Sequence, residues 1–187
     1  MIHLIRHGET DGNGNHYMGR QDLPLNATGR AQAEALVPLL AGRPISHIFA
    51  SPLQRAIRTA RPLAVAGGLP VEIVPAVIEI DFGHLENARK DDYALDLRKR
   101  HHTEPLPGGE SLLNVWTRLL PFVERLGQVA KPETDIALVG HYWSLRMLQG
   151  MLSGLSFAQT VQARSYTPKT GSVTSLCPPS QKLSVMM

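Results

Sequence analysis

The sequence predicts an α/β fold with three layers, α/β/α, built on a mostly parallel, doubly wound sheet. Short apolar runs of strand length recur along the 187-residue chain. Segments with apolar residues at helical spacing separate them, which is typical of a parallel sheet covered on both faces. The apolar runs stop abruptly at polar residues or glycine, as strands do at the edge of a sheet.

The first expected strand begins at Ile2 and stops at Arg6-His7-Gly8. Residues 11–26 are rich in glycine and asparagine and predict a long loop. Thr28 is the expected N-cap of a helix over Arg30–Leu40. A proline near the end of that helix should kink or shorten it.

The second strand is expected at Ile45–Ala50 and ends at Ser51-Pro52. Proline is favoured in the first turn of a helix, so Leu53–Ala66 is the second expected helix. Pro62 falls inside it and predicts a bend. Val71–Val74 is a third short strand.

Residues Glu79–Gly109 break this alternation, and we expect a short lid-like excursion that partly covers the carboxyl edge of the sheet. Tyr93, Leu95 and Leu97 give the excursion some helical character. It also contains the basic cluster Arg98–His102, which is either a rim that attracts phosphorylated ligands or, as we favour, a solvated helix face.

A third helix should start at the N-cap Ser111 and run to about Ala130, interrupted at Pro121. The remaining expected elements are a strand at Ile136–Val139, a helix at about Ser144–Leu152, a strand at Ser172–Leu176 and a loose tail at about Pro178–Met187. No internal repeat or linker divides the chain, so residues 1–187 are expected to form one domain.

Composition narrows the functional classes. The lone Cys177 cannot form an internal disulfide, and no secretory leader or bilayer-length apolar run is visible. We therefore expect a cytoplasmic protein without a membrane partner. The formal charge of +3 is mild. It suits a cleft that attracts small phosphorylated metabolites, and we expect no nucleic-acid partner. Nothing in the sequence indicates the oligomeric state.

Polar residues follow several expected strands, where the crevice of a doubly wound sheet binds ligands. These segments are Arg6-His7-Gly8, Ser51–Arg55, Glu79–Gly83 and Gly140-His141. Two arginines, two histidines and a carboxylate suit phosphoryl transfer: the arginines neutralise phosphoryl oxygens, a histidine attacks phosphorus, and the carboxyl group protonates the leaving oxygen.

Each of these residues has an ordinary alternative as a surface or capping residue when taken alone. A metal site built from His7, His141 and Glu79 is the other joint use of the set. No close ligand spacing supports it, and the arginines would repel a cation, so we expect no metal and no cofactor.

The chain resembles the histidine phosphatase superfamily, the phosphoglycerate-mutase-like enzymes. The resemblance covers most of the chain in order, through Leu4–Thr10, Gly19–Gly29, Ser51–Ala56 with Thr59-Ala60, Glu79–Glu86, Pro107–Ser111 and Val139–His141. It implies a phosphoglycerate-mutase-like α/β/α fold and a phosphohistidine intermediate.

The same resemblance implies a role for each matched residue. His7 would be the nucleophile, with its ring held by a backbone carbonyl, and Glu79 the proton donor. The phosphoryl group would be surrounded by Arg6, Asn13, Arg55 and His141. Backbone N–H groups of the helix after His141 would add to this anion site.

Three departures from the family pattern concern substrate identity. Tyr142, followed by Trp143, replaces a small residue, and Met18 stands before Gly19 where relatives often carry a hydroxyl or amide. Asn87 stands where many relatives have glycine. Met18, Gly19 and Tyr142 are therefore the candidate substrate-pocket residues.

The modest excursion favours a phosphatase, because an open site lets water take the phosphoryl group from His7. The alternative within the family is mutase-type phosphoryl transfer. The alternative of another class is a non-catalytic phospho-ligand or protein-binding module. Intact His7 and Glu79 argue against that module, because binding needs neither a nucleophile nor a proton donor.

Overall fold

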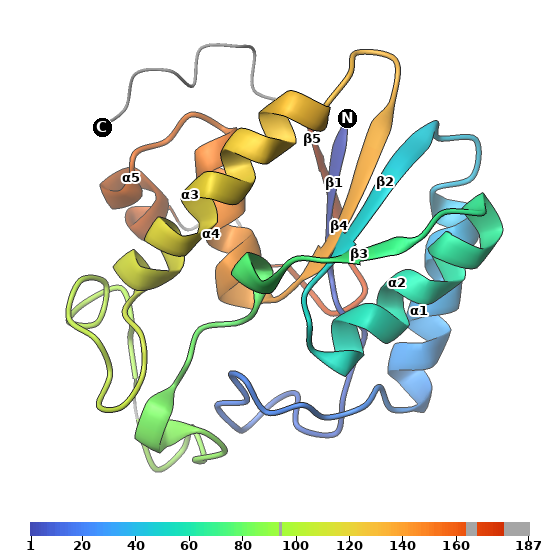
Figure 1. Cartoon of the computed structure of the whole chain (residues 1–187). Coiled ribbons are helices and arrows are strands. Elements are labelled where there is room, and N and C mark those ends of the chain that lie inside the picture. The colour runs from blue at the N-terminus through green and yellow to red at the C-terminus, as the bar shows by residue number, and fades with distance from the viewer. Residues whose placement is uncertain (94, 164–167, 178–187) are drawn as a thin grey trace.

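A five-stranded sheet in the order β3-β2-β4-β1-β5 runs through the middle of the protein (Figure 1). The computed structural model describes residues 1–93, 95–163 and 168–177. In chain order the strands are β1 (Ile2–Arg6), β2 (Ile45–Ala50), β3 (Val71–Ile73), β4 (Asp135–Gly140) and β5 (Val173–Leu176). β1, β2, β3 and β4 pair in parallel, whereas β5 pairs antiparallel with β1. The mostly parallel sheet is confirmed.

Helices cover both faces of the sheet (Figure 1). They are α1 (Ala27–Leu39), α2 (Gln54–Gly67), α3 (Leu112–Val129), α4 (Tyr142–Leu152) and α5 (Phe157–Gln162), with short 3₁₀ turns at η1 (Pro75–Val77) and η2 (Gly83–Leu85). Alternate residues of β1 face opposite sides, so Ile5 packs with α1 and α2 while Leu4 belongs to the cluster under α3 and α4. The three layers expected from the sequence are confirmed.

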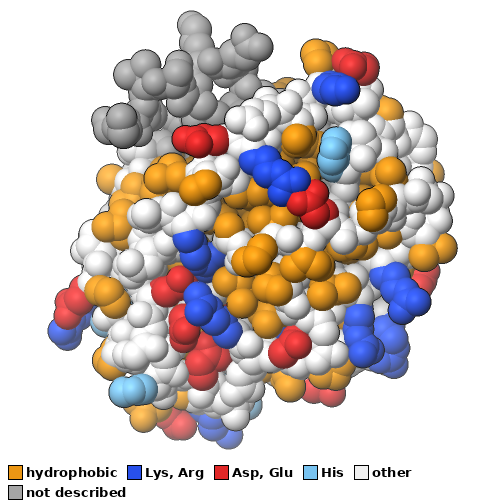
Figure 2. Space-filling model, in the orientation of Figure 1, with side chains coloured by type: hydrophobic (Ala, Val, Ile, Leu, Met, Phe, Trp, Pro, Cys, Tyr) orange, Lys and Arg blue, Asp and Glu red, His pale blue; other side chains and the backbone are white. Residues whose placement is uncertain are grey.

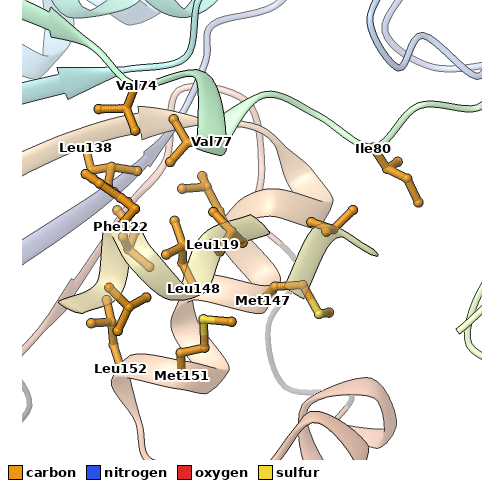
Figure 3. Close-up of a cluster of buried hydrophobic side chains, with 14 of the residues drawn as sticks. Val74, Val77, Ile80, Leu119, Phe122, Leu138, Met147, Leu148, Met151 and Leu152 are labelled. Carbon is orange, nitrogen blue, oxygen red and sulfur yellow. The ribbon is translucent and has the colours of Figure 1, made fainter. Parts of the chain in front are cut away.

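The larger core cluster lies between the sheet and the α3–α4 pair (Figure 3). Leu119 and Phe122 of α3 meet Leu148 of α4 beside Leu138 of the sheet. Burial of these side chains holds α4 against the sheet and thereby places the start of α4 at the carboxyl end of the sheet.

Two helix starts differ from those expected. Asn26, not Thr28, caps α1, because its side-chain oxygen accepts the Gly29 N–H at 2.9 Å. α4 begins at Tyr142, two residues before the expected Ser144. Ser144 instead lies in the first turn, where its hydroxyl accepts the His141 N–H at 3.2 Å. The expected cap Thr28 lies inside α1.

The bend and interruption expected at Pro62 and Pro121 do not end a helix: α2 and α3 each continue through their proline. A proline removes one backbone hydrogen bond from a helix. In α3 the neighbouring Leu119 and Phe122 are buried, and their packing offsets that loss. At Pro38 the expected shortening agrees with the structure, since α1 ends at Leu39.

Helix α5 was not expected. Its start is a capping box in which the Ser156 hydroxyl accepts the Gln159 N–H at 3.3 Å. The Ser-x-x-Gln spacing is the sequence signal that identifies such a start.

The excursion lies at the carboxyl end of the sheet beside the loop that follows β1 (Figure 1). Backbone hydrogen bonds join the two segments, from Tyr17 N to Ala88 O at 3.0 Å and from Asn87 N to Tyr17 O at 2.8 Å. The helical character expected around 93–97 is wrong, because none of the described residues of 89–102 lies in a helix. Tyr93 is 51% exposed and Leu97 only 2%, so these residues share no apolar face.

The face that carries α3 and β3 shows hydrophobic side chains at its centre with charged side chains around them (Figure 2). Among the described residues, no helix is long and apolar enough to cross a bilayer. The tail expected to be loose, residues 178–187, lies outside the described residues.

Candidate active site

A cavity of about 390 Å³ opens at the carboxyl ends of the parallel strands. Its lining contains every expected site residue except His141: Arg6, His7, Asn13, Met18, Gly19, Arg55, Glu79 and Tyr142. His141 is fully buried behind His7, with the two ring centroids 5.0 Å apart. The fold therefore brings together residues from four separate segments of the chain.

One nitrogen of His7 is fixed by the backbone. Its Nδ1 lies 2.7 Å from the carbonyl oxygen of Gly8. A carbonyl oxygen only accepts, so Nδ1 carries the proton and the lone pair is left on Nε2. The Gly8 N–H donates in turn to the Thr59 hydroxyl at 2.9 Å. The ring restraint expected for His7 is confirmed.

Both histidines favour the neutral form. Burial, followed by the positive charge of Arg55, lowers the pKa of His7 well below 6.5. The same two causes, in the same order, lower the pKa of His141 well below 6.5. At neutral pH, Nε2 of His7 therefore keeps its lone pair.

Two guanidinium groups flank His7. Arg55, 3% exposed, donates to Gly19 O at 2.7 Å and to Gln21 O. Arg6 donates to Pro168 O at 2.8 Å. Carbonyl contacts orient these cations without neutralising their charge, so this part of the cavity attracts an anion.

The hydroxyl of Ser51 orients His141, lying 2.7 Å from its Nε2. Among the described residues, Nδ1 of His141 is a buried atom with no hydrogen-bond partner. Ser51 belongs to the segment Ser51–Arg55 that the sequence singled out. Its role in orienting His141 could not be predicted, because the two residues are 90 positions apart and meet only in the folded protein.

Glu79 accepts hydrogen bonds at the start of α4. The backbone N–H groups of Trp143 and Ser144 donate to its Oε1 at 3.1 and 3.3 Å, and Ile80 donates at 2.9 Å. These three backbone donors fix the orientation of the Glu79 side chain. These two helical N–H groups, expected to serve the phosphoryl site, contact Glu79 instead.

Asn13 is oriented by Thr10, whose N–H and hydroxyl donate to the Asn13 side-chain oxygen at 2.7 and 2.9 Å. The amide nitrogen is therefore the group that Asn13 can offer to an anion.

Aromatic, apolar and polar side chains together form the rest of the cavity lining. Beyond the expected Met18 and Tyr142, its lining includes His16, Tyr17, Phe82, Lys90, Leu95, Leu97 and Trp143. Sequence reasoning missed these residues as cavity lining, apart from Trp143. Most come from the excursion or the loop after β1, whose irregular backbone has no periodic signal.

Gly19 and Asn87 hold special backbone conformations nearby. Gly19 has a φ of +37°, and a Cβ there would lie 1.9 Å from Glu86 Oε1. Asn87, with a φ of 65°, occupies the left-handed region that favours glycine. Asparagine tolerates that region better than most residues that carry a Cβ atom.

The basic cluster Arg98–His102 does not line the cavity. Arg98 pairs with Asp96 at 3.1 Å, and Arg100 with Glu104 at 2.8 Å. These local ion pairs favour a solvated surface over a ligand-binding rim. Among the described residues, no group of three or more His, Cys, Asp or Glu side chains could hold a metal ion.

Comparisons with known proteins agree with this site. A model of the histidine phosphatase superfamily (branch 1) matches residues 2–186. The chain is 30% identical over 164 residues to phosphoserine phosphatase 1 of Hydrogenobacter thermophilus, covering 83% of this chain and 77% of that protein. It is also 30% identical over 164 residues to the 2,3-bisphosphoglycerate-dependent phosphoglycerate mutase of Cytophaga hutchinsonii, covering 82% and 77%.

Among solved structures, mycobacterial glucosyl-3-phosphoglycerate phosphatase in complex with VO3 is similar, with a TM-score of 0.81 and 28% identity. The match covers 92% of this chain and 90% of that one. The relatives thus include both phosphatases and mutases.

Proposed function

This chain belongs to the histidine phosphatase superfamily, and on that premise we propose that it hydrolyses small-molecule phosphate monoesters through a phosphohistidine on His7. The observation that carries the proposal is the 2.7 Å contact between His7 Nδ1 and Gly8 O. It leaves the Nε2 lone pair of a buried, neutral histidine in a cavity flanked by two arginines.

In the first proposed step, Arg6, Arg55, Asn13 and His141 hold the phosphoryl oxygens. Nε2 of His7 forms a bond to phosphorus as the bond to the ester oxygen breaks. The protonated carboxyl group of Glu79 gives its proton to that leaving oxygen.

In the second step, water attacks phosphorus and the N–P bond breaks, which returns the lone pair to His7. Glu79, now a carboxylate, takes the proton released by the water. The cycle thus restores both residues and needs no metal or cofactor.

Transfer back to a substrate, as in a mutase, is the second candidate and is favoured by the mutase among the relatives. The short excursion favours water as the acceptor. The non-catalytic binding module is disfavoured because simple anion binding requires no oriented lone pair on His7.

The test is to incubate the protein with a generic phosphate ester and to measure phosphate release, with and without a chelator. His7→Ala should abolish turnover, whereas the exposed control His84→Ala should not change it. A trapped phosphohistidine in the unmodified protein would support the covalent step. Undiminished hydrolysis by His7→Ala would falsify the assignment, and isomerisation of phosphoglycerate without net phosphate release would favour the mutase.

A further inference from the structure

Glu79 lies in an irregular segment between η1 and η2, so no strand or helix ladder fixes its backbone. Val77 and Ile80, both fully buried, anchor the segment in the core (Figure 3). These apolar side chains provide no hydrogen-bond donors, so the backbone carbonyl groups around Glu79 must find donors elsewhere.

Arg118 of α3 supplies those donors. Its Nη2 donates to Ile78 O at 2.8 Å and to Glu79 O at 3.1 Å. Its Nη1 donates to Ala76 O. One guanidinium group therefore contacts three carbonyls within four residues of backbone that end at Glu79.

Glu110 orients this guanidinium group. Nε of Arg118 donates to Glu110 Oε1 at 3.0 Å. The other carboxylate oxygen of Glu110 accepts the Asp81 N–H at 3.1 Å. Arg118 and Glu110 thus hold the chain on both sides of Glu79, and both side chains are at most 20% exposed.

We propose that Arg118 is a positioning residue that sets the main chain of Glu79, so that the carboxyl group reaches the leaving oxygen. The start of α4 restrains the carboxylate end, and Arg118 restrains the backbone end. A lysine cannot reproduce the planar fork that reaches several carbonyls at once. This inference rests on the proposed proton-donor role of Glu79.

The test compares kcat/KM for two substrates. Glycerol 2-phosphate has an alkoxide leaving group that needs a proton, whereas p-nitrophenyl phosphate has a stable phenolate that does not. Arg118→Met should lower kcat/KM for the alkyl ester by roughly tenfold to a hundredfold, and for the aryl ester by about twofold or less. For the alkyl ester, Arg118→Lys should have a kcat/KM between the values of Arg118→Met and the unmodified protein.

The matched control is Arg125→Met on the same helix, because Arg125 pairs with Glu72 at the surface. Arg125→Met should leave kcat/KM unchanged for both substrates. Thermal unfolding of each variant checks the fold. Should Arg118→Met fail to fold, Glu110→Gln removes the orienting charge while keeping the side-chain volume, and should show the same selectivity.

Glu79→Gln is the benchmark that separates the two levels of inference. If Glu79→Gln is selective for the alkyl ester and neither Arg118→Met nor Glu110→Gln is, Arg118 does not position the acid. If Glu79→Gln affects both esters equally, the acid role of Glu79 fails, and the positioning role falls with it.

Discussion

Tyr142 closes one wall of the cavity directly after the second histidine. The guanidinium carbon of Arg6 lies 5.5 Å from its ring centroid, and Trp143 packs edge-on against it at 5.0 Å. Met18 forms part of the outer lining, and a Cβ on Gly12 would lie 2.3 Å from its sulfur. A substrate that bound here would place its alcohol group near the Tyr142 and Trp143 rings, and aromatic side chains pack well against a ring.

We therefore predict that Tyr142→Ala raises the KM for benzyl phosphate about tenfold, because a buried ring contact of order 1 kcal/mol or more is lost. The KM for glycerol 2-phosphate should change little. Both esters have alkyl leaving groups, so steady-state kinetics with the pair compares contacts rather than leaving-group chemistry. Equal rises in both KM values would contradict an aromatic wall.

At the scale of elements, the first turn of α1 touches the loop that leaves β1. A Cβ on Gly29 would lie 2.0 Å from Glu9 O, and one on Gly8 would lie 2.4 Å from Gly29 O. The two backbones are in direct contact. Gly8 O holds the His7 ring, so a shift of α1 would also shift the ring of His7.

Gly29→Ala should therefore lower the free energy of unfolding by about 1–3 kcal/mol through overpacking, and should also lower kcat. Urea unfolding and steady-state kinetics measure the two effects. Gly127→Ala in α3 is the matched control, since a Cβ there meets no atom within 4 Å. It should raise stability by about 0.5–1 kcal/mol. If Gly29→Ala changed neither the free energy of unfolding nor kcat, the contact between α1 and the loop would not constrain the site.

At the scale of the whole molecule, the two buried histidines link stability to pH. Burial lowers the pKa of His7 and of His141 in the folded protein below the ordinary value of 6.5. Below pH 6.5 the unfolded chain therefore binds protons that the folded protein does not. The free energy of unfolding must then fall as the pH drops from 6.5 toward the folded-state pKa values, and these groups have no effect at higher pH.

Urea unfolding from about pH 7.5 to about pH 5, in a phosphate-free buffer, should show this fall. His7→Gln keeps a neutral polar side chain and removes one titrating group. It should reduce the slope by at most about 1.4 kcal/mol per pH unit. His84→Gln, at an exposed position, should leave the slope unchanged. An unaltered slope in His7→Gln would show that His7 does not carry the linkage.

The sequence alone determined the chain order of the strands and of the helices other than α5, and it placed polar residues after several strands. These features follow from local patterns: apolar runs, helical spacing and abrupt stops at residues such as His7 and His141. Parallel strands bring their carboxyl ends to one edge, so a shared site could be inferred without coordinates. The backbone of the described residues of 89–102 could not be inferred, because that part of the sequence has no repeating apolar pattern.

Only the tertiary structure decided which backbone groups serve which side chain. The start of α4 contacts Glu79 rather than the phosphoryl site, Ser51 orients His141, and Arg118 reaches the carbonyls beside Glu79. Each of these contacts joins residues at least 39 positions apart. Their geometry depends on how α3 and α4 pack on the sheet, and no local spacing in the sequence contains that information.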